Sequence, residues 1–156
     1  MLSGHRFALV AVLIGLITFL HGLVTWPLPA VLALFIGGAL IAFGAEIIAI
    51  RTQALSHHIG PQVGGVPLYL LAAWPGTIYV AFRLSLLVTE GWYAVFLCAT
   101  LATIYDVFTD YRGVEAGNWS FTDRIRGPTY RGVPWWNFVG WFLISCSTAA
   151  LALPFL

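Results

Sequence analysis

The chain has 156 residues, of which 60% are hydrophobic and only 8% are charged. Soluble domains carry a charge on about a quarter of their residues, so this composition excludes a soluble enzyme and indicates a protein embedded in a membrane. The formal net charge of +1 leaves no basic surface that would neutralise a run of phosphates, which excludes nucleic acid as a partner.

Apolar stretches divide the chain into five predicted membrane helices. A helix needs about 20 residues to cross the hydrocarbon of a bilayer, and the first apolar run is too long for a signal peptide. Pro27 and Pro29 stop the first helix, and Pro67 opens the third. The predicted spans are residues 7–26, 30–50, 67–88, 91–108 and 136–153. We therefore predict an all-α integral membrane protein, a single helical domain with a polar loop between the last two helices.

The arginines predict the orientation of these helices. With five spans, successive connections alternate between the two sides of the membrane. Six of the seven arginines then fall on one side, and only Arg83 approaches the other. Because cytoplasmic connections are enriched in Lys and Arg, we expect a multi-pass protein of the cell membrane with its N-terminus in the cytoplasm and its C-terminus outside. The polar connections at residues 52–66 and 111–135 would share the cytoplasmic face.

Carboxyl groups inside two predicted spans are the first candidates for chemistry. Glu46 lies in the second span and Asp106 in the fourth, with Asp110 four residues later on the same helical face. An ionisable side chain in a span costs a few kcal/mol at least and by default marks a functional site. We interpret Glu46 and Asp106 as candidate proton donors. The alternative is that both pair with arginines and only hold helices together.

Two adjacent histidines, His57 and His58, lie in the first polar connection. Imidazole and carboxylate groups are metal ligands, but the helical spacings typical of histidine metal sites are absent. We therefore predict no metal and favour acid–base or structural roles for both side chains. Cys98 and Cys146 lie in apolar runs without Cys-x-x-Cys spacing, so neither a disulfide framework nor a zinc site is indicated.

Tryptophans are abundant near the predicted helix ends, where an aromatic belt at the membrane interface explains most of them. Trp74, Trp119 and Trp141 fit that belt less well. Aromatic faces that line an apolar pocket also stabilise a carbocation by cation–π attraction. We predict these three side chains as walls of a substrate pocket, with the interfacial alternative left open.

The order of the motifs resembles a known family. Glu46 is followed by Arg51-Thr52 and by Gly65-Val66-Pro67, and a later run reads Tyr-Arg-Gly-Val-Pro-Trp-Trp-Asn-Phe-Val-Gly-Trp from Tyr130 to Trp141. Over roughly residues 44–145 the chain resembles the carotenoid biosynthesis membrane protein family, which includes carotenoid hydratases of the bisanhydrobacterioruberin hydratase type.

The resemblance implies a hydro-lyase that adds water to a terminal C=C bond of a carotenoid or another lipophilic isoprenoid, without a cofactor. Asp106 or Glu46 would protonate the alkene, and Asp110 or His58 would deprotonate the attacking water. Asn137 would hold the water or the new hydroxyl, or would instead cap the last helix. The substrate-binding residues predicted on this basis are Trp74, Trp119, Tyr130, Asn137 and Trp141.

Other functions remain open. One is a metal-dependent membrane hydroxylase or hydrolase built on His57, His58 and the acidic residues. Another is a non-catalytic carotenoid-binding or accessory subunit. A small transporter would need interrupted helices in two repeats, and only Pro75-Gly76 offers such a break. In each case the expected partners are the lipid bilayer, a carotenoid or related isoprenoid, and other membrane enzymes of carotenoid biosynthesis.

Overall fold

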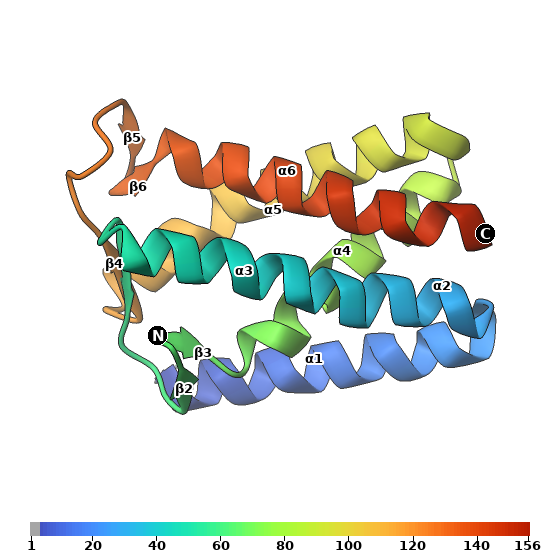
Figure 1. Cartoon of the computed structure of the whole chain (residues 1–156), viewed down its shortest axis with the longest axis horizontal. Coiled ribbons are helices and arrows are strands. Elements are labelled where there is room, and N and C mark those ends of the chain that lie inside the picture. The colour runs from blue at the N-terminus through green and yellow to red at the C-terminus, as the bar shows by residue number, and fades with distance from the viewer. Residues whose placement is uncertain (1–3) are drawn as a thin grey trace.

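A computed structural model describes residues 4–156 of the chain, and it confirms the predicted fold class (Figure 1). The described residues form a bundle of five helices with only short strands between them. Four helices are long and apolar enough to cross a membrane, and the shorter apolar helix, α4, has 17 residues. The helical bounds are α1 Gly4–Thr25, α2 Leu28–Leu32, α3 Gly38–Arg51, α4 Leu70–Leu86, α5 Gly91–Glu115 and α6 Trp135–Ala152.

The second membrane helix is built from three consecutive segments. The short helix α2 continues through a π-helical stretch, η1 (Ala33–Gly37), into α3, so that residues 28–51 form one rod. Pro27 and Pro29 bring the chain round from α1 into this rod, as proline is tolerated at the first helical turn and not in the interior. At the other terminus α6 ends in a single 3-10 turn, η2 (Leu153–Phe155).

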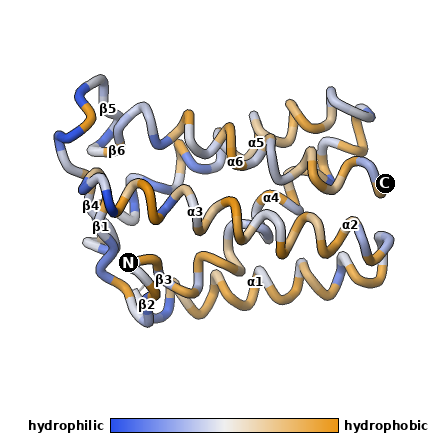
Figure 2. The backbone as a smooth tube through the Cα atoms, viewed as in Figure 1, coloured by the Kyte–Doolittle hydropathy of each residue, from blue (hydrophilic) through white to orange (hydrophobic). Residues whose placement is uncertain are grey.

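All six short strands lie at one end of the bundle, which we call the loop end; the opposite end, with the C-terminus, we call the closed end (Figure 1). Strand β1 (Leu55–His57) pairs antiparallel with β4 (Trp119–Phe121), which ties the two polar connections together. The other strands form two small hairpins, β2 (Gln62–Val63) with β3 (Val66–Pro67) and β5 (Thr129–Tyr130) with β6 (Val133–Pro134). Figure 2 shows hydrophilic residues concentrated here and apolar residues along the helices.

Helix α4 occupies the centre of the bundle, in contact with α1, α3, α5 and α6. Its contact with α1 depends on small residues. A Cβ atom added to Gly76 would lie 3.0 Å from the Cα of Gly15, and one added to Gly15 would meet the backbone carbonyl of Ala72. Without water to drive helices together, close backbone packing at such residues stabilises helix pairs in lipid.

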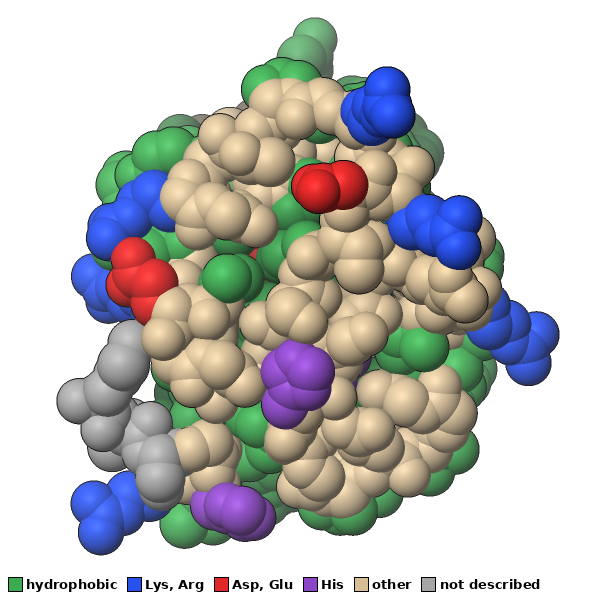
Figure 3. All heavy atoms as spheres, turned by 90° about the vertical axis from the view of Figure 1, so that its left-hand side faces the viewer, with side chains coloured by type: hydrophobic (Ala, Val, Ile, Leu, Met, Phe, Trp, Pro, Cys, Tyr) green, Lys and Arg blue, Asp and Glu red, His purple; other side chains and the backbone are tan. Residues whose placement is uncertain are grey.

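Arginines mark the loop end. Arg83 lies in the last turn of α4 at the closed end, where its guanidinium is 5.6 Å from the ring centroid of Trp26. The others lie near the start of α1, at the ends of α3 and α5, and in the β4–β6 region. Figure 3 views the loop end, with basic side chains around its rim. The cytoplasmic placement of this end stays a prediction.

Two buried clusters fill the interior. The closed-end cluster packs Trp26, Phe35, Tyr79 and Phe82 among small residues of α5 and α6. The loop-end cluster contains fewer large side chains, with Tyr69 and Trp74 among them. The candidate functional site lies beside this second cluster.

Candidate functional site

A cavity of about 210 Å³ opens in the loop-end half of the bundle. Helices α1, α4 and α5 form most of its wall, and β1 and β4 close it toward the loops. It collects seven of the nine side chains predicted from the sequence to be functional. These are Glu46, Trp74, Asp106, Asp110, Trp119, Asn137 and Trp141.

Two aspartates of α5 share one hydrogen-bond donor in this cavity. The Nδ2 of Asn137 donates to Asp106 at 3.0 Å and to Asp110 at 3.1 Å. The spacing of four residues puts both carboxyl groups on one face of α5, and Asn137 reaches them from the first turns of the neighbouring α6. Asn137 does not cap α6, whose N-cap residue is Pro134. Asp106 is only 4% exposed, so this carboxyl is almost entirely removed from solvent.

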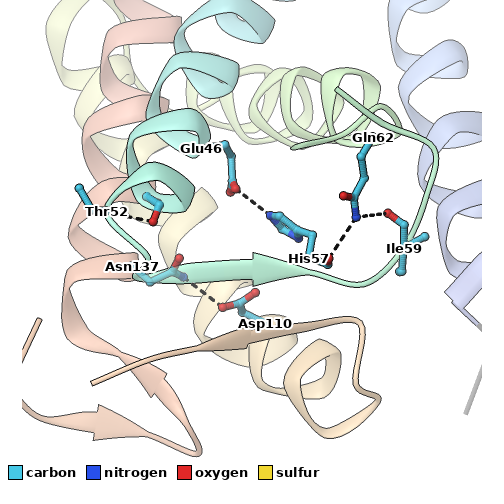
Figure 4. Close-up of polar contacts among 8 residues, drawn as sticks. Glu46, Thr52, His57, Ile59, Gln62, Asp110 and Asn137 are labelled. Carbon is cyan, nitrogen blue, oxygen red and sulfur yellow. Dashed lines mark hydrogen bonds and ion pairs between the residues drawn. The ribbon is translucent and has the colours of Figure 1, made fainter. Parts of the chain in front are cut away.

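A histidine–carboxylate pair forms a second polar group. The Nε2 of His57 lies 2.7 Å from Oε2 of Glu46, and both side chains are almost fully buried. Figure 4 shows the two side chains pointing toward each other from β1 and α3, with Asn137 directed at Asp110 nearby. When Glu46 is ionised, Nε2 carries the proton that it donates, and Nδ1 is left as a free acceptor. The Nδ1 atom is buried and finds no hydrogen-bond partner among residues 4–156.

Two more side chains that line the cavity each carry a buried polar atom without a partner in the described part of the chain. These atoms are the hydroxyl of Tyr69 and the Nε1 of Trp119. Buried polar atoms are almost always hydrogen-bonded in folded proteins, and leaving one unsatisfied costs about 1–3 kcal/mol. Together with His57 Nδ1, three such atoms belong to residues around one cavity. They indicate a site that receives a polar group of a ligand.

Aromatic rings supply the apolar wall. The rings of Trp74 and Trp141 meet edge to face with centroids 5.6 Å apart. Trp119 packs against Phe7 and lies over Gly113, where an added Cβ would overlap the indole ring. Glycine at this position therefore allows the indole to lie flat on α5 and reach the cavity.

The cavity opens sideways between α1 and α5. Val10, Ile14 and Tyr105 border it and are 44%, 46% and 55% exposed. These residues lie on membrane helices, where an exposed apolar side chain faces lipid. A lipophilic ligand would therefore reach the polar groups directly from the bilayer.

Two predicted site residues lie outside the cavity. His58 is exposed and lies 3.0 Å from the hydroxyl of Ser120 through its Nε2. Tyr130 is 45% exposed and packs edge to face on Tyr111 in the last connection. Since neighbouring residues of a strand point to opposite sides, the strand β1 explains why His57 enters the cavity and His58 does not.

Tyr69 belongs to no motif that the sequence singles out, and the sequence points to His57 only together with His58, with an acid–base or structural role favoured over a metal. Alternation along residues 55–58 would have separated the two histidines had the strand been recognised. Within residues 4–156, no group of three or more His, Cys, Asp or Glu side chains is arranged to hold a metal ion.

Comparison with known protein families shows to which family the chain belongs. The family model described as "Carotenoid biosynthesis protein" matches residues 6–155. The chain belongs to this family. The resemblance stated from the motifs is thereby confirmed, and the match includes every helix that borders the cavity. Together with the four apolar helices, it indicates that this carotenoid biosynthesis protein is a membrane protein.

The chain is also similar to a protein whose name states an activity. The bisanhydrobacterioruberin hydratase of Haloarcula japonica is 32% identical over 128 residues, which cover 74% of this chain and 42% of that protein. The chain thus spans less than half the length of this relative. No solved structure matches the chain.

Proposed function

We propose that this carotenoid biosynthesis protein is a membrane-embedded hydratase that adds water to a terminal C=C bond of a carotenoid or related isoprenoid. One observation carries the proposal. A buried and a half-buried carboxyl group, joined by one amide, share an aromatic-walled cavity with a histidine whose Nδ1 is unpaired, and the cavity opens to lipid. The family and the name of the Haloarcula japonica relative support the same chemistry.

The aspartate pair is the proposed proton donor. Both carboxyl groups accept a hydrogen bond from the same nitrogen, so their negative charges would lie close together in a poorly solvated place. Two like charges at such a distance disfavour double ionisation, as in aspartic proteases, where two carboxyl groups share one proton. One of Asp106 and Asp110 therefore holds a proton, and that proton is transferred to the less substituted carbon of the alkene.

The tryptophans stabilise the intermediate. Protonation of an isopropylidene end leaves a positive charge on the tertiary carbon, and no neighbouring heteroatom delocalises this charge. The faces of Trp74, Trp119 and Trp141 border the cavity, and an aromatic face stabilises a desolvated cation by about 2 kcal/mol or more.

His57 is the proposed base, and Glu46 positions it. The water oxygen forms a bond to the tertiary carbon while His57 Nδ1 takes one of its protons. The Glu46 carboxylate holds the Nε2–H, fixes the tautomer and stabilises the imidazolium. Return of that proton to the aspartate pair completes the cycle, so the sum of the reaction is one water added to one double bond.

Expression in a host that makes an acyclic carotenoid with free isopropylidene ends tests the proposal. Mass spectrometry of the pigment should show a gain of one or two waters with the wild-type chain. Asp106→Asn and Glu46→Gln should each abolish most of the gain. Asp123→Asn, in an exposed loop outside the cavity, is the matched control and should retain it.

A well-expressed wild-type chain that leaves every such pigment unchanged in mass would contradict the hydratase. Pigment that co-purifies with the protein without any change of mass would favour the carotenoid-binding subunit instead. The unpaired Tyr69 hydroxyl and Trp119 N–H would then serve to bind a polar end group of the carotenoid.

A further inference from the structure

A second cavity, of about 260 Å³, lies behind the first between α3 and α6. The two cavities share a wall made of Glu46, Leu55, Trp74, Asn137 and Trp141. The second cavity therefore reaches two polar residues of the first, Glu46 and Asn137, from between α3 and α6.

The second cavity extends to the loop end of the bundle. Thr52, just after α3, and Ile125, in the last polar connection, both border it and are exposed. Most of its remaining lining comes from α3 between Ala45 and Ala49 and from α6 between Trp136 and Ile144. Its outer part thus reaches the polar connections, and it also borders Ile48 of α3, which is 65% exposed.

Residues with unused hydrogen-bonding atoms line this second cavity. The Nε1 of Trp136 is buried and has no acceptor within residues 4–156. Asn137 commits both hydrogens of its NH₂ group to the two aspartates, so its carbonyl oxygen is free to accept a hydrogen bond. Glu46 presents a carboxylate on the same wall, bonded through Oε2 to His57.

We propose that the second cavity is the water inlet of the site, holding water on Trp136 Nε1, Asn137 Oδ1 and Glu46 and delivering it through the shared wall. This inference rests on the proposed hydration, which consumes one water in every turnover. An isoprenoid that fills the lateral opening between α1 and α5 blocks that route for water. The reaction therefore needs a second route, and this cavity joins the loop end to the residues that hold the base.

The chemistry of the lining fits water. A buried water makes about three hydrogen bonds to otherwise unsatisfied polar groups, and it takes roughly 30 Å³ of liquid volume. The cavity has room for several molecules. One donor, Trp136 Nε1, and two acceptors on the shared wall, Asn137 Oδ1 and Glu46, are the polar partners that the residues around this cavity offer to water.

Thiol accessibility tests the inlet independently of any catalysis. Gly140 borders the second cavity, and an added Cβ there meets nothing within 4 Å. Its neighbour Val139 lies at the same depth, is 45% exposed and borders neither cavity. Gly140→Cys and Val139→Cys are made in a chain with Cys98→Ala and Cys146→Ala, and each is treated in nanodiscs with a charged methanethiosulfonate.

Gly140→Cys should react at least about tenfold faster than Val139→Cys, because the reactive thiolate forms in water and not in hydrocarbon. Equal rates at the two positions, whether fast or slow, would overturn the inlet. This readout needs no substrate, so it decides the inlet even where no pigment is hydrated.

A larger side chain that fills the second cavity tests whether water reaches the site through it. Gly140→Leu should lower the turnover of hydration about tenfold or more with little change in KM, since the isoprenoid binds elsewhere. Val139→Leu should hydrate as the wild type does. A raised KM in Gly140→Leu would show that the isoprenoid itself passes through this space, and unchanged turnover would show that water arrives by another way; either result overturns the proposal. If the wild type hydrates no pigment, by contrast, only the proposed function fails.

Discussion

Each end of the bundle buries a tyrosine, and the two hydroxyl groups differ in their hydrogen bonds. At the closed end the Tyr79 hydroxyl lies 2.7 Å from His21 Nδ1 and 3.2 Å from the Thr25 hydroxyl. At the loop end the Tyr69 hydroxyl and His57 Nδ1 have no partner among the described residues, and both residues line a cavity. Completed hydrogen bonds stabilise a fold, whereas uncompleted ones cost stability and leave atoms free for a ligand.

The largest expected effect is the loss of hydration when a carboxyl group at the loop end is replaced. Asp110→Asn keeps the size of the side chain but removes the shared proton, so pigment hydration per molecule of protein should fall about 10²–10⁴-fold, the usual range for a general acid. Glu90→Gln, at the exposed start of α5 at the closed end, is the matched control and should hydrate normally. Full activity in Asp110→Asn would remove the aspartate pair from the mechanism.

Stability should depend most on the closed end. Phe82 is fully buried there, in edge-to-face contact with Trp26. Phe82→Ala should lower the free energy of unfolding by about 3–5 kcal/mol, because the deleted ring leaves a cavity in packed surroundings. Unfolding in mixed micelles, followed by tryptophan fluorescence, measures this change. A midpoint equal to that of the wild type would show that the closed end is not the stabilising half.

Two adjacent histidines sharpen the comparison within the loop end. His57→Gln removes the unpaired Nδ1 acceptor and should reduce hydration about a hundredfold, as expected for loss of a general base. His58→Gln alters only an exposed contact with Ser120 and should leave hydration unchanged. Mass spectrometry of pigment from matched expression levels compares the two. The opposite order of effects would place the base on His58.

The two buried tyrosines give the smallest effects, in opposite directions. Tyr79→Phe loses completed hydrogen bonds and should cost about 0.5–1.5 kcal/mol of stability without affecting hydration. Tyr69→Phe removes an unpaired hydroxyl, so stability should stay equal or rise while hydration or pigment binding falls. Unfolding and pigment assays on both variants test this crossover, and similar behaviour of the two would erase the proposed distinction between the ends.

The sequence was sufficient for the helical architecture. Each of the five apolar runs is a helix, because a segment in lipid satisfies its backbone hydrogen bonds most simply as a helix. The shared face of Asp106 and Asp110 also followed from helical spacing alone. Both predictions depend only on residues that are close together along the chain.

The remaining parts of the site depend on how distant segments meet. Asn137 bridges the aspartates only because α6 packs on α5 in one rotational setting, which hydropathy does not encode. His57 enters the cavity because residues 55–57 pair with residues 119–121, and polar connections carry no apolar periodicity from which that pairing follows. Tyr130 belongs to the most specific motif, yet its ring packs on the outside of the last connection.

The pairing of β1 with β4 also orders the assembly of the protein. Two membrane helices, α4 and α5, separate these strands in the chain, and the cavity draws side chains from Phe7 near the N-terminus to Trp141 in the last helix. Since chains are made from the N-terminus, the turn at Pro27, at the closed end, forms early. Strand β1 cannot pair until β4 has been made. While α6 is still inside the ribosome, its residues Asn137 and Trp141 cannot take their places in the site. The site is therefore completed only after α6 has left the ribosome, later than the turn at Pro27.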